Sequence, residues 1–134
     1  MASQHLNFTS KSENISLVEK LIDDVCAEYK VNEDHYGNIL VAVTEAVNNA
    51  LYHGNKLNPD KMVDISFEPK DESTLVFTIK DQGEGFDIAT LPDPTNPENL
   101  EKISGRGVFL MKSLSDNIEF NDDGRSVEME FKLN

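Results

Sequence analysis

Residues 63–80 read VDISFEPKDESTLVFTIK, and their pattern predicts an antiparallel hairpin. Alternation with period two is typical of strands that bury one face and expose the other. The polar turn at residues 70–73 makes the two strands pair antiparallel. A sheet built on this hairpin needs helices over its apolar face, which is formed by Val63, Ile65, Phe67, Leu75, Phe77 and Ile79.

A helix is predicted upstream of the hairpin, from about residue 33 to residue 53, with Asn32 as N-cap and Gly54 as a left-handed stop. At about 100° per residue, Glu45 and Asn49 lie together on the side opposite the apolar stripe. The stripe itself consists of Tyr36, Ile39, Leu40, Val43, Val47, Ala50 and Leu51.

An earlier helix is predicted to begin near residues 14–16, where Ser16 and Glu19 fit a capping box. Weak alternation over residues 5–9 predicts a short edge strand before it. The apolar stripe predicted for this helix is Leu17, Val18, Leu21, Ile22 and Val25.

Downstream of the hairpin, a polar segment with three prolines, residues 86–104, is predicted to be a lid. A helix is predicted from Gly105 to about Leu114, followed by strands near residues 117–121 and 126–133 around a turn. The order β-α-α-β-β-α-β-β predicts an α+β fold. We expect one domain over residues 1–134, a two-layer α/β sandwich with a mixed, mainly antiparallel sheet covered on one face by helices.

The composition excludes several classes of function. With 25 acidic and 12 basic residues, the formal net charge is −13, which disfavours nucleic acid as a partner. No apolar run approaches the roughly 20 residues of a membrane span, and no signal peptide is visible. A single cysteine, Cys26, fits a reducing cytoplasm.

Three separated motifs are candidates for chemistry. Glu45 and Asn49 are four residues apart, so a carboxylate and an amide oxygen share one helix face. Such a pair can position Mg²⁺, and the carboxylate can act as a general base. Taken alone, the pair is more often an ordinary solvated polar face.

The second motif, Asp81-x-Gly83-x-Gly85, follows a strand. Its glycines permit close approach of a flat ligand, and its carboxylate can accept a hydrogen bond from an amine such as that of adenine. A plain turn at a strand end is the alternative interpretation.

The third motif, Gly105-x-Gly107, opens a helix, where free N–H groups and the helix dipole favour phosphate. Residues 102–115 hold three basic residues and no acidic one, so the local charge welcomes an anion. The alternative is a helix start with a flexible hinge. The sequence contains neither a Walker A motif nor the protein-kinase signature set.

Together the motifs resemble those of the GHKL (Bergerat-fold) ATPase superfamily. Glu45 to Asn49 is similar to its N-box, and the two glycine motifs are similar to its glycine boxes, in the same order. The nearest resemblance is to the anti-sigma-factor serine/threonine kinases of the SpoIIAB/RsbW type. It rests on residues 44–50 with His53-Gly54-Asn55, and on residues 93–100 leading to residues 104–111.

The resemblance implies a set of roles. Glu45 would be the general base, Asn49 the Mg²⁺ ligand in the ATP site, and Asp81 the acceptor for the adenine amine. The base pocket would be shaped by Gly83 and Gly85. The phosphates would be lined by Gly105, Arg106 and Gly107, and Ser126 would stand near adenine as a weaker assignment.

One departure bears on the chemistry. Some members carry an arginine before the second glycine box, where this chain reads Lys102-Ile103-Ser104, so Arg106 or Lys102 must contact the terminal phosphate or transfer is slow. The resemblance implies a kinase that uses ATP and Mg²⁺ to phosphorylate a STAS-domain antagonist, with a sigma factor as a further partner and homodimers common among relatives. The alternative is an ATP-loaded module that sequesters a partner without significant transfer.

Overall fold

The computed structural model describes residues 3–83 and 103–133, with the backbone alone for residues 103–106. The predicted order of strands and helices is confirmed. In chain order the elements are β1 (Gln4–Thr9), α1 (Ile15–Glu28), α2 (Glu33–Asn48), β2 (Met62–Asp71), β3 (Thr74–Lys80), α3 (Ile103–Leu114), β4 (Asn117–Asn121) and β5 (Ser126–Lys132). Among the described helices, none combines the length and the apolar character that a membrane span requires.

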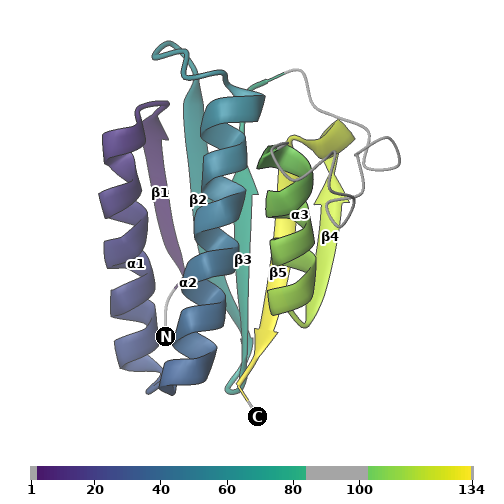
Figure 1. Cartoon of the computed structure of the whole chain (residues 1–134). Coiled ribbons are helices and arrows are strands. Elements are labelled where there is room, and N and C mark those ends of the chain that lie inside the picture. Colours follow the sequence, from purple (N-terminus) through teal and green to yellow (C-terminus); the bar gives the residue numbers. More distant parts are fainter. Residues whose placement is uncertain (1–2, 84–102, 134) are drawn as a thin grey trace.

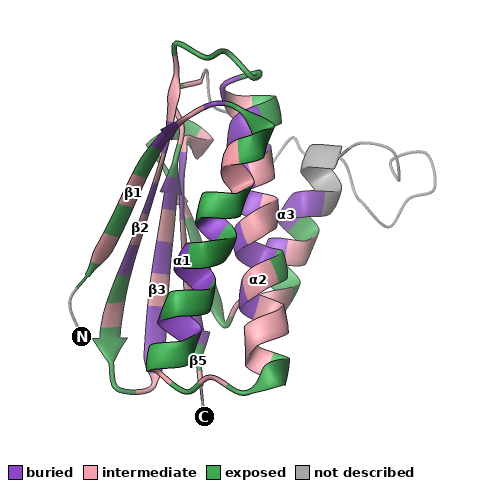
Figure 2. Ribbon diagram, turned by 90° about the vertical axis from the view of Figure 1, so that its left-hand side faces the viewer, coloured by how far each residue is buried: buried purple, intermediate pink, exposed green. Residues whose placement is uncertain are grey.

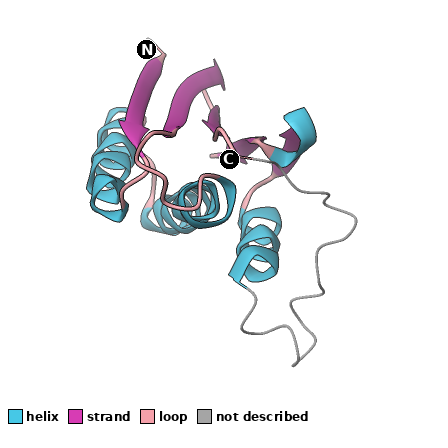
Figure 3. Ribbon diagram, turned by 90° about the horizontal axis from the view of Figure 1, so that it is seen from above, coloured by secondary structure: helices cyan, strands magenta, loops and turns pink. Residues whose placement is uncertain are grey.

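The five strands form one sheet in the order β1-β2-β3-β5-β4. Every pairing in it is antiparallel, so the described sheet is antiparallel throughout, where the sequence predicted a partly mixed one. All three helices cover the same face, and α2 lies between α1 and α3 (Figures 1 and 3). The predicted two-layer α+β architecture is therefore confirmed.

The core lies between the sheet and the helices (Figure 2). The alternating apolar residues of β2, β3 and β5 point into it, as their period-two pattern predicts. A row of aromatic rings crosses the sheet there, with centroids 5.2 Å apart between Phe67 and Phe77 and 6.0 Å apart between Phe77 and Phe131.

Two predictions of local helix structure have opposite outcomes. The N-cap of α2 is confirmed, because Asn32 Oδ1 accepts a hydrogen bond from His35 N at 2.8 Å. The capping box of α1 is wrong: the helix has already begun at Ile15, and the Ser16 hydroxyl donates to the Glu13 carbonyl. Leu17 is also 44% exposed, although it was expected in the buried stripe.

Gly54 does not end the helix in a left-handed conformation. The chain continues from α2 into a π-helical turn, Asn49–Gly54, which closes with Asn55 N donating to Ala50 O at 2.8 Å. The left-handed backbone comes later, at Lys56 and Leu57. The turn places Gly54 against Asp81.

The helix α3 begins at Ile103, two residues before the predicted start. Gly105 and Gly107 therefore lie inside the helix and not at its first position. The predicted lid, residues 86–104, falls outside the described residues except for its last two, which belong to α3.

Candidate functional site

Glu45 of α2 and Asn49, the first residue of the π-helical turn that continues this helix, lie on the side that faces α3. The alternative interpretation of this pair, an ordinary solvated polar face, does not hold for Asn49, since the residue is only 8% exposed. The cause is the neighbouring helix α3 (Figure 3), whose Gly107 lies against the Asn49 side chain. Glu45 is half-buried at the same interface.

Gly107 is the residue of α3 that meets this pair. A Cβ atom on Gly107 would stand 3.0 Å from Glu45 Oε2 and 3.1 Å from Asn49 Nδ2. Distances this short are tighter than ordinary van der Waals contact. The structure thus brings together the first and third sequence motifs, which are separated by more than fifty residues along the chain.

The Asn49 side chain is unusual because neither atom of its amide has a hydrogen-bond partner among the described residues. A buried polar atom without a partner costs on the order of 1–3 kcal/mol, so folded proteins rarely keep one without a use. The site offers two side-chain oxygens, one from the unpartnered Asn49 amide and one from the Glu45 carboxylate. Gly107 lies opposite them and has no side chain to fill the space. Mg²⁺ fits it, because this cation takes one or two protein oxygens and fills its other positions with water and phosphate.

The second motif forms a separate cluster at the end of β3. Asp81 Oδ1 accepts a hydrogen bond from Gly83 N at 2.8 Å, and Asp81 N donates to Arg125 O at 2.9 Å. Arg125 Nε donates in turn to Gly83 O at 2.7 Å. The turn that carries the carboxylate is therefore held by the hairpin between β4 and β5.

Gly54 is pressed against this carboxylate. A Cβ on Gly54 would stand 2.5 Å from Asp81 Cγ, and a Cβ on Gly83 would stand 2.0 Å from the Gly54 carbonyl oxygen. Both positions therefore require glycine for close approach and not for backbone conformation. Sequence analysis missed this role of Gly54, although its position directly after the Glu45-Asn49 helix was the available signal.

Burial raises the pKa of the Asp81 carboxyl above its usual value. The hydrogen bond from Gly83 N and the positive charge of Arg125 act in the opposite direction. A half-buried carboxylate that keeps one oxygen on a backbone N–H is suited to accept a hydrogen bond from a ligand with its other oxygen.

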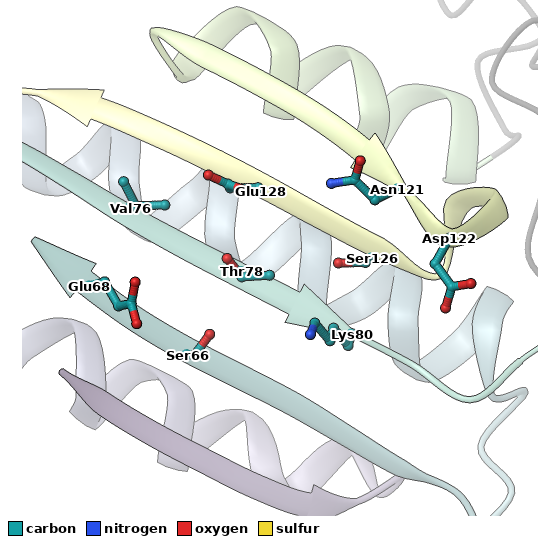
Figure 4. A pocket seen from close by; sticks show the side chains of 9 residues that line it. All are labelled: Ser66, Glu68, Val76, Thr78, Lys80, Asn121, Asp122, Ser126 and Glu128. Carbon is teal, nitrogen blue, oxygen red and sulfur yellow. The ribbon is translucent and has the colours of Figure 1, made fainter. Parts of the chain in front are cut away.

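Not all predicted residues join these clusters. Ser126 lies on the face of the sheet that no helix covers, in a cavity of about 460 Å³ that it lines with Thr78 and Lys80 (Figure 4). It faces away from Glu45 and Asn49, because Val127, its neighbour in β5, is the residue that points toward the helices. Gly85 lies outside the described residues, as does the side chain of Arg106, whereas Gly105 lies in the first turn of α3.

Comparisons with known proteins identify the family of the chain. Residues 8–131 match the model of a family described as "Histidine kinase-like ATPase domain". An anti-sigma F factor of Heyndrickxia coagulans is 33% identical over 124 residues, which cover 90% of this chain and 84% of that protein. The serine-protein kinase RsbW of Staphylococcus epidermidis is 29% identical over 132 residues, covering 92% and 82% of the two chains.

A solved structure shows the same fold. It contains the RsbU and RsbW domains of Rv1364c from Mycobacterium tuberculosis and superposes with a TM-score of 0.68 at 12% identity. The match covers 99% of this chain but only 32% of that longer chain. At this identity the likeness supports the fold alone.

The resemblance inferred from the motifs is confirmed by these matches, and the names of the relatives support the prediction of a serine kinase. The family match spans most of the described chain and includes all the clusters described above. The chain belongs to the histidine kinase-like ATPase domain family, together with the anti-sigma F factors and the serine-protein kinase RsbW.

Proposed function

We propose that the protein is an ATP-dependent serine/threonine protein kinase of the anti-sigma-factor type that acts in the cytoplasm. Its substrate is a STAS-domain antagonist, and a sigma factor is the regulated partner. The observation that carries this proposal is the meeting of Gly107 with the Glu45 carboxylate and the unpartnered Asn49 amide. The name anti-sigma F factor supports a sigma factor as the partner, and the name serine-protein kinase supports transfer to a hydroxyl group. The STAS-domain substrate rests on the resemblance of the sequence motifs alone.

Two clusters divide the work of binding ATP. At the end of β3, Asp81 accepts a hydrogen bond from the adenine amine. Gly54 and Gly83 have no side chains, so the backbone packs closely around this carboxylate. At the interface of α2 and α3, the glycines of α3 line the phosphates, and Asn49 holds Mg²⁺. When bound, Mg²⁺ neutralises charge on the phosphates.

Glu45 is the group that moves a proton. The hydroxyl oxygen of the partner forms a bond to the terminal phosphorus as the bond from that phosphorus to ADP breaks, and Glu45 accepts the hydroxyl proton. The half-buried carboxylate beside Gly107 is near the amide assigned to the metal, so base and metal ligand serve the same phosphate.

One sequence feature favours a second candidate function, partner binding without phosphoryl transfer. The stretch Lys102-Ile103-Ser104 has no arginine for the terminal phosphate, so a module that sequesters its partner without transfer is the alternative. The test is incubation of the purified chain with labelled ATP, Mg²⁺ and a STAS protein from the same genome. Label on the STAS protein that is lost when Mg²⁺ is chelated is the expected result. Stable binding of the STAS protein or a sigma factor with no label transferred would favour the sequestering module.

A further inference from the structure

We infer that Asn55 is a positioning residue that sets the Asp81 carboxylate for adenine, an inference that rests on the proposed function. Asn55 follows the π-helical turn directly and is only 1% exposed. Both heavy atoms of its side-chain amide are hydrogen bonded. A buried amide with this set of bonds fixes the segments it joins.

One end of the Asn55 amide is anchored on the sheet. Its Nδ2 donates to Ser10 Oγ at 2.8 Å and to Met62 O at 2.9 Å. Ser10 follows β1, and Met62 is the first residue of β2. β1 and β2 pair antiparallel, and Thr9 and Met62 form the last residue pair between them. The Nδ2 atom of Asn55 is therefore hydrogen bonded to a rigid part of the sheet.

The other end of the amide holds the adenine motif. Asn55 Oδ1 accepts a hydrogen bond from Gln82 N at 2.8 Å. Gln82 lies between Asp81 and Gly83, and the N–H of Gly83 donates a hydrogen bond to the Asp81 carboxylate. Fixing the peptide before Gln82 therefore fixes the turn that orients the carboxylate.

Two further contacts strengthen this coupling. The Gln82 side chain returns to the same strand, because its Oε1 accepts from Met62 N at 2.7 Å. The residue before Asn55 is Gly54, whose Cα is pressed against the Asp81 carboxyl group. The pair Gly54-Asn55 thus holds both the side chain of Asp81 and the backbone that follows it.

Ser10 provides a matched control for a purely structural role. It is as buried as Asn55, at 1% exposure, and shares a hydrogen bond with it. Its own hydroxyl and N–H both donate to Lys61 O, however, and neither reaches residues 81–83. Ser10→Ala should therefore weaken the same network on the side away from the adenine motif.

The experiment measures base discrimination as well as stability. ITP carries a carbonyl oxygen where ATP carries the amine, so the ratio of their dissociation constants reports the hydrogen bond to Asp81. The ratio is measured by calorimetry with Mg²⁺ for wild type, Asn55→Ala, Ser10→Ala and Gln82→Ala, and urea unfolding gives the stability of each. If a variant is only less folded, its apparent affinities for ATP and ITP fall by the same factor, and the ratio of the two dissociation constants stays unchanged.

We expect wild type to prefer ATP by about tenfold or more, as a hydrogen bond to a charged group implies. Asn55→Ala should reduce the preference to within about threefold, whereas Ser10→Ala should unfold at lower urea with the wild-type ratio. Gln82→Ala changes an exposed side chain and should reduce the preference in part.

An Asn55→Ala protein with the wild-type ratio would overturn the positioning role. If that variant does not fold, an unchanged ratio in Gln82→Ala overturns it instead. Wild-type protein that binds ATP and ITP equally would overturn the assignment of Asp81 to adenine, a result distinct from either of these.

Discussion

At the scale of the single residue, Asn49 lowers the stability of the ligand-free protein while serving the proposed binding of Mg²⁺ and ATP. Its amide is buried without a partner among the described residues, which is unfavourable for the free protein and useful for binding a ligand. Asn48, the preceding residue of α2, is less buried and offers a control with the same side chain. Substitution at the two positions should therefore separate the ligand site from the general polarity of the helix.

Asn49→Leu should raise the free energy of unfolding of the ligand-free protein by about 1 kcal/mol, because an unpaired buried amide is replaced by an apolar group of similar size. The same variant should lose the dependence of ATP affinity on Mg²⁺. Urea unfolding and calorimetry with and without Mg²⁺ measure the two effects. A less stable variant with intact Mg²⁺ dependence would contradict the assignment, and Asn48→Leu should change neither quantity in this way.

Glu45→Gln tests the base separately from binding. The substitution keeps the shape of the side chain beside Gly107 and removes its capacity to accept a proton. Phosphorylation of the STAS protein should fall by about 10²–10⁴-fold, the usual contribution of general-base assistance. The affinity for Mg²⁺ and ATP, measured in parallel, should stay close to the wild-type value. Transfer at the wild-type rate would remove Glu45 from the reaction.

Asp81 gives a pH dependence whose sign follows from burial. Because burial raises its pKa in the folded chain, Asp81 stabilises the fold fully only below the unfolded pKa, and this contribution is lost as the pH rises through the folded pKa. Asp81→Asn should therefore exceed wild type in stability at neutral pH. The difference should shrink as the pH falls toward about 4, near the ordinary pKa of aspartate. Urea midpoints across this range measure it, and a difference independent of pH would contradict the cause.

At the scale of the element, the glycines form a graded series because the neighbours of a Cβ atom differ at each. Gly83 would meet a backbone oxygen at 2.0 Å, Gly54 a carboxyl carbon at 2.5 Å, and Gly107 side-chain atoms from 3.0 Å. Gly37, in the second turn of α2, would meet nothing within 4 Å. The loss of stability on substitution by alanine should thus be largest where the distance is shortest.

We expect Gly83→Ala to destabilise the protein most, followed by Gly54→Ala and then Gly107→Ala. Gly37→Ala should stabilise it by roughly 0.5–1 kcal/mol, since alanine has the higher helix propensity. Urea unfolding of the four variants gives the order directly. Gly107→Ala should also weaken ATP binding, because its methyl group enters the space between Glu45 and Asn49. Equal costs at all four positions would contradict this account.

The elements show how far sequence reasoning reaches. Period-two alternation gave the strands, and the 3.6-residue period with Asn32 gave α2, because these signals are local. The burial of Asn49 depends on α3 packing beside α2, and the use of Gly54 depends on Asp81, a contact between segments distant in the chain. Tertiary contacts of this kind leave no periodic signal in the sequence.

At the scale of the whole molecule, the excess of acidic groups dominates. The formal net charge of −13 is spread over a chain of 134 residues, and its mutual repulsion opposes the compact state. The ion pairs seen within the described part of the chain join His5 to Asp64, Lys70 to Glu130, and Arg125 to Asp122 and Asp123, and each of them includes an exposed side chain. Exposed pairs of this kind contribute little to stability. Attraction between opposite charges therefore compensates little of the repulsion.

Stability should accordingly rise with ionic strength. Between about 10 mM and 150 mM NaCl the screening length shortens from roughly 30 Å to 8 Å, so repulsion across the molecule is largely removed. The urea midpoint should increase over this range, and sodium sulfate at equal ionic strength should give at least the same increase. A midpoint that falls with NaCl would show that attractive pairs outweigh the net charge.

The π-helical turn Asn49–Gly54 has a consequence for how this chain tolerates changes in length. A π-helical turn amounts to one residue inserted into an α-helix, so deleting one residue from it restores regular α-helical spacing. The deletion would improve the local hydrogen bonding and would also turn Gly54 by about 100° around the helix axis, away from Asp81. A one-residue gap here would be tolerated by the helix and not by the site. Length variation should therefore be found in the turn at residues 72–73 between β2 and β3, where no residue of either cluster lies.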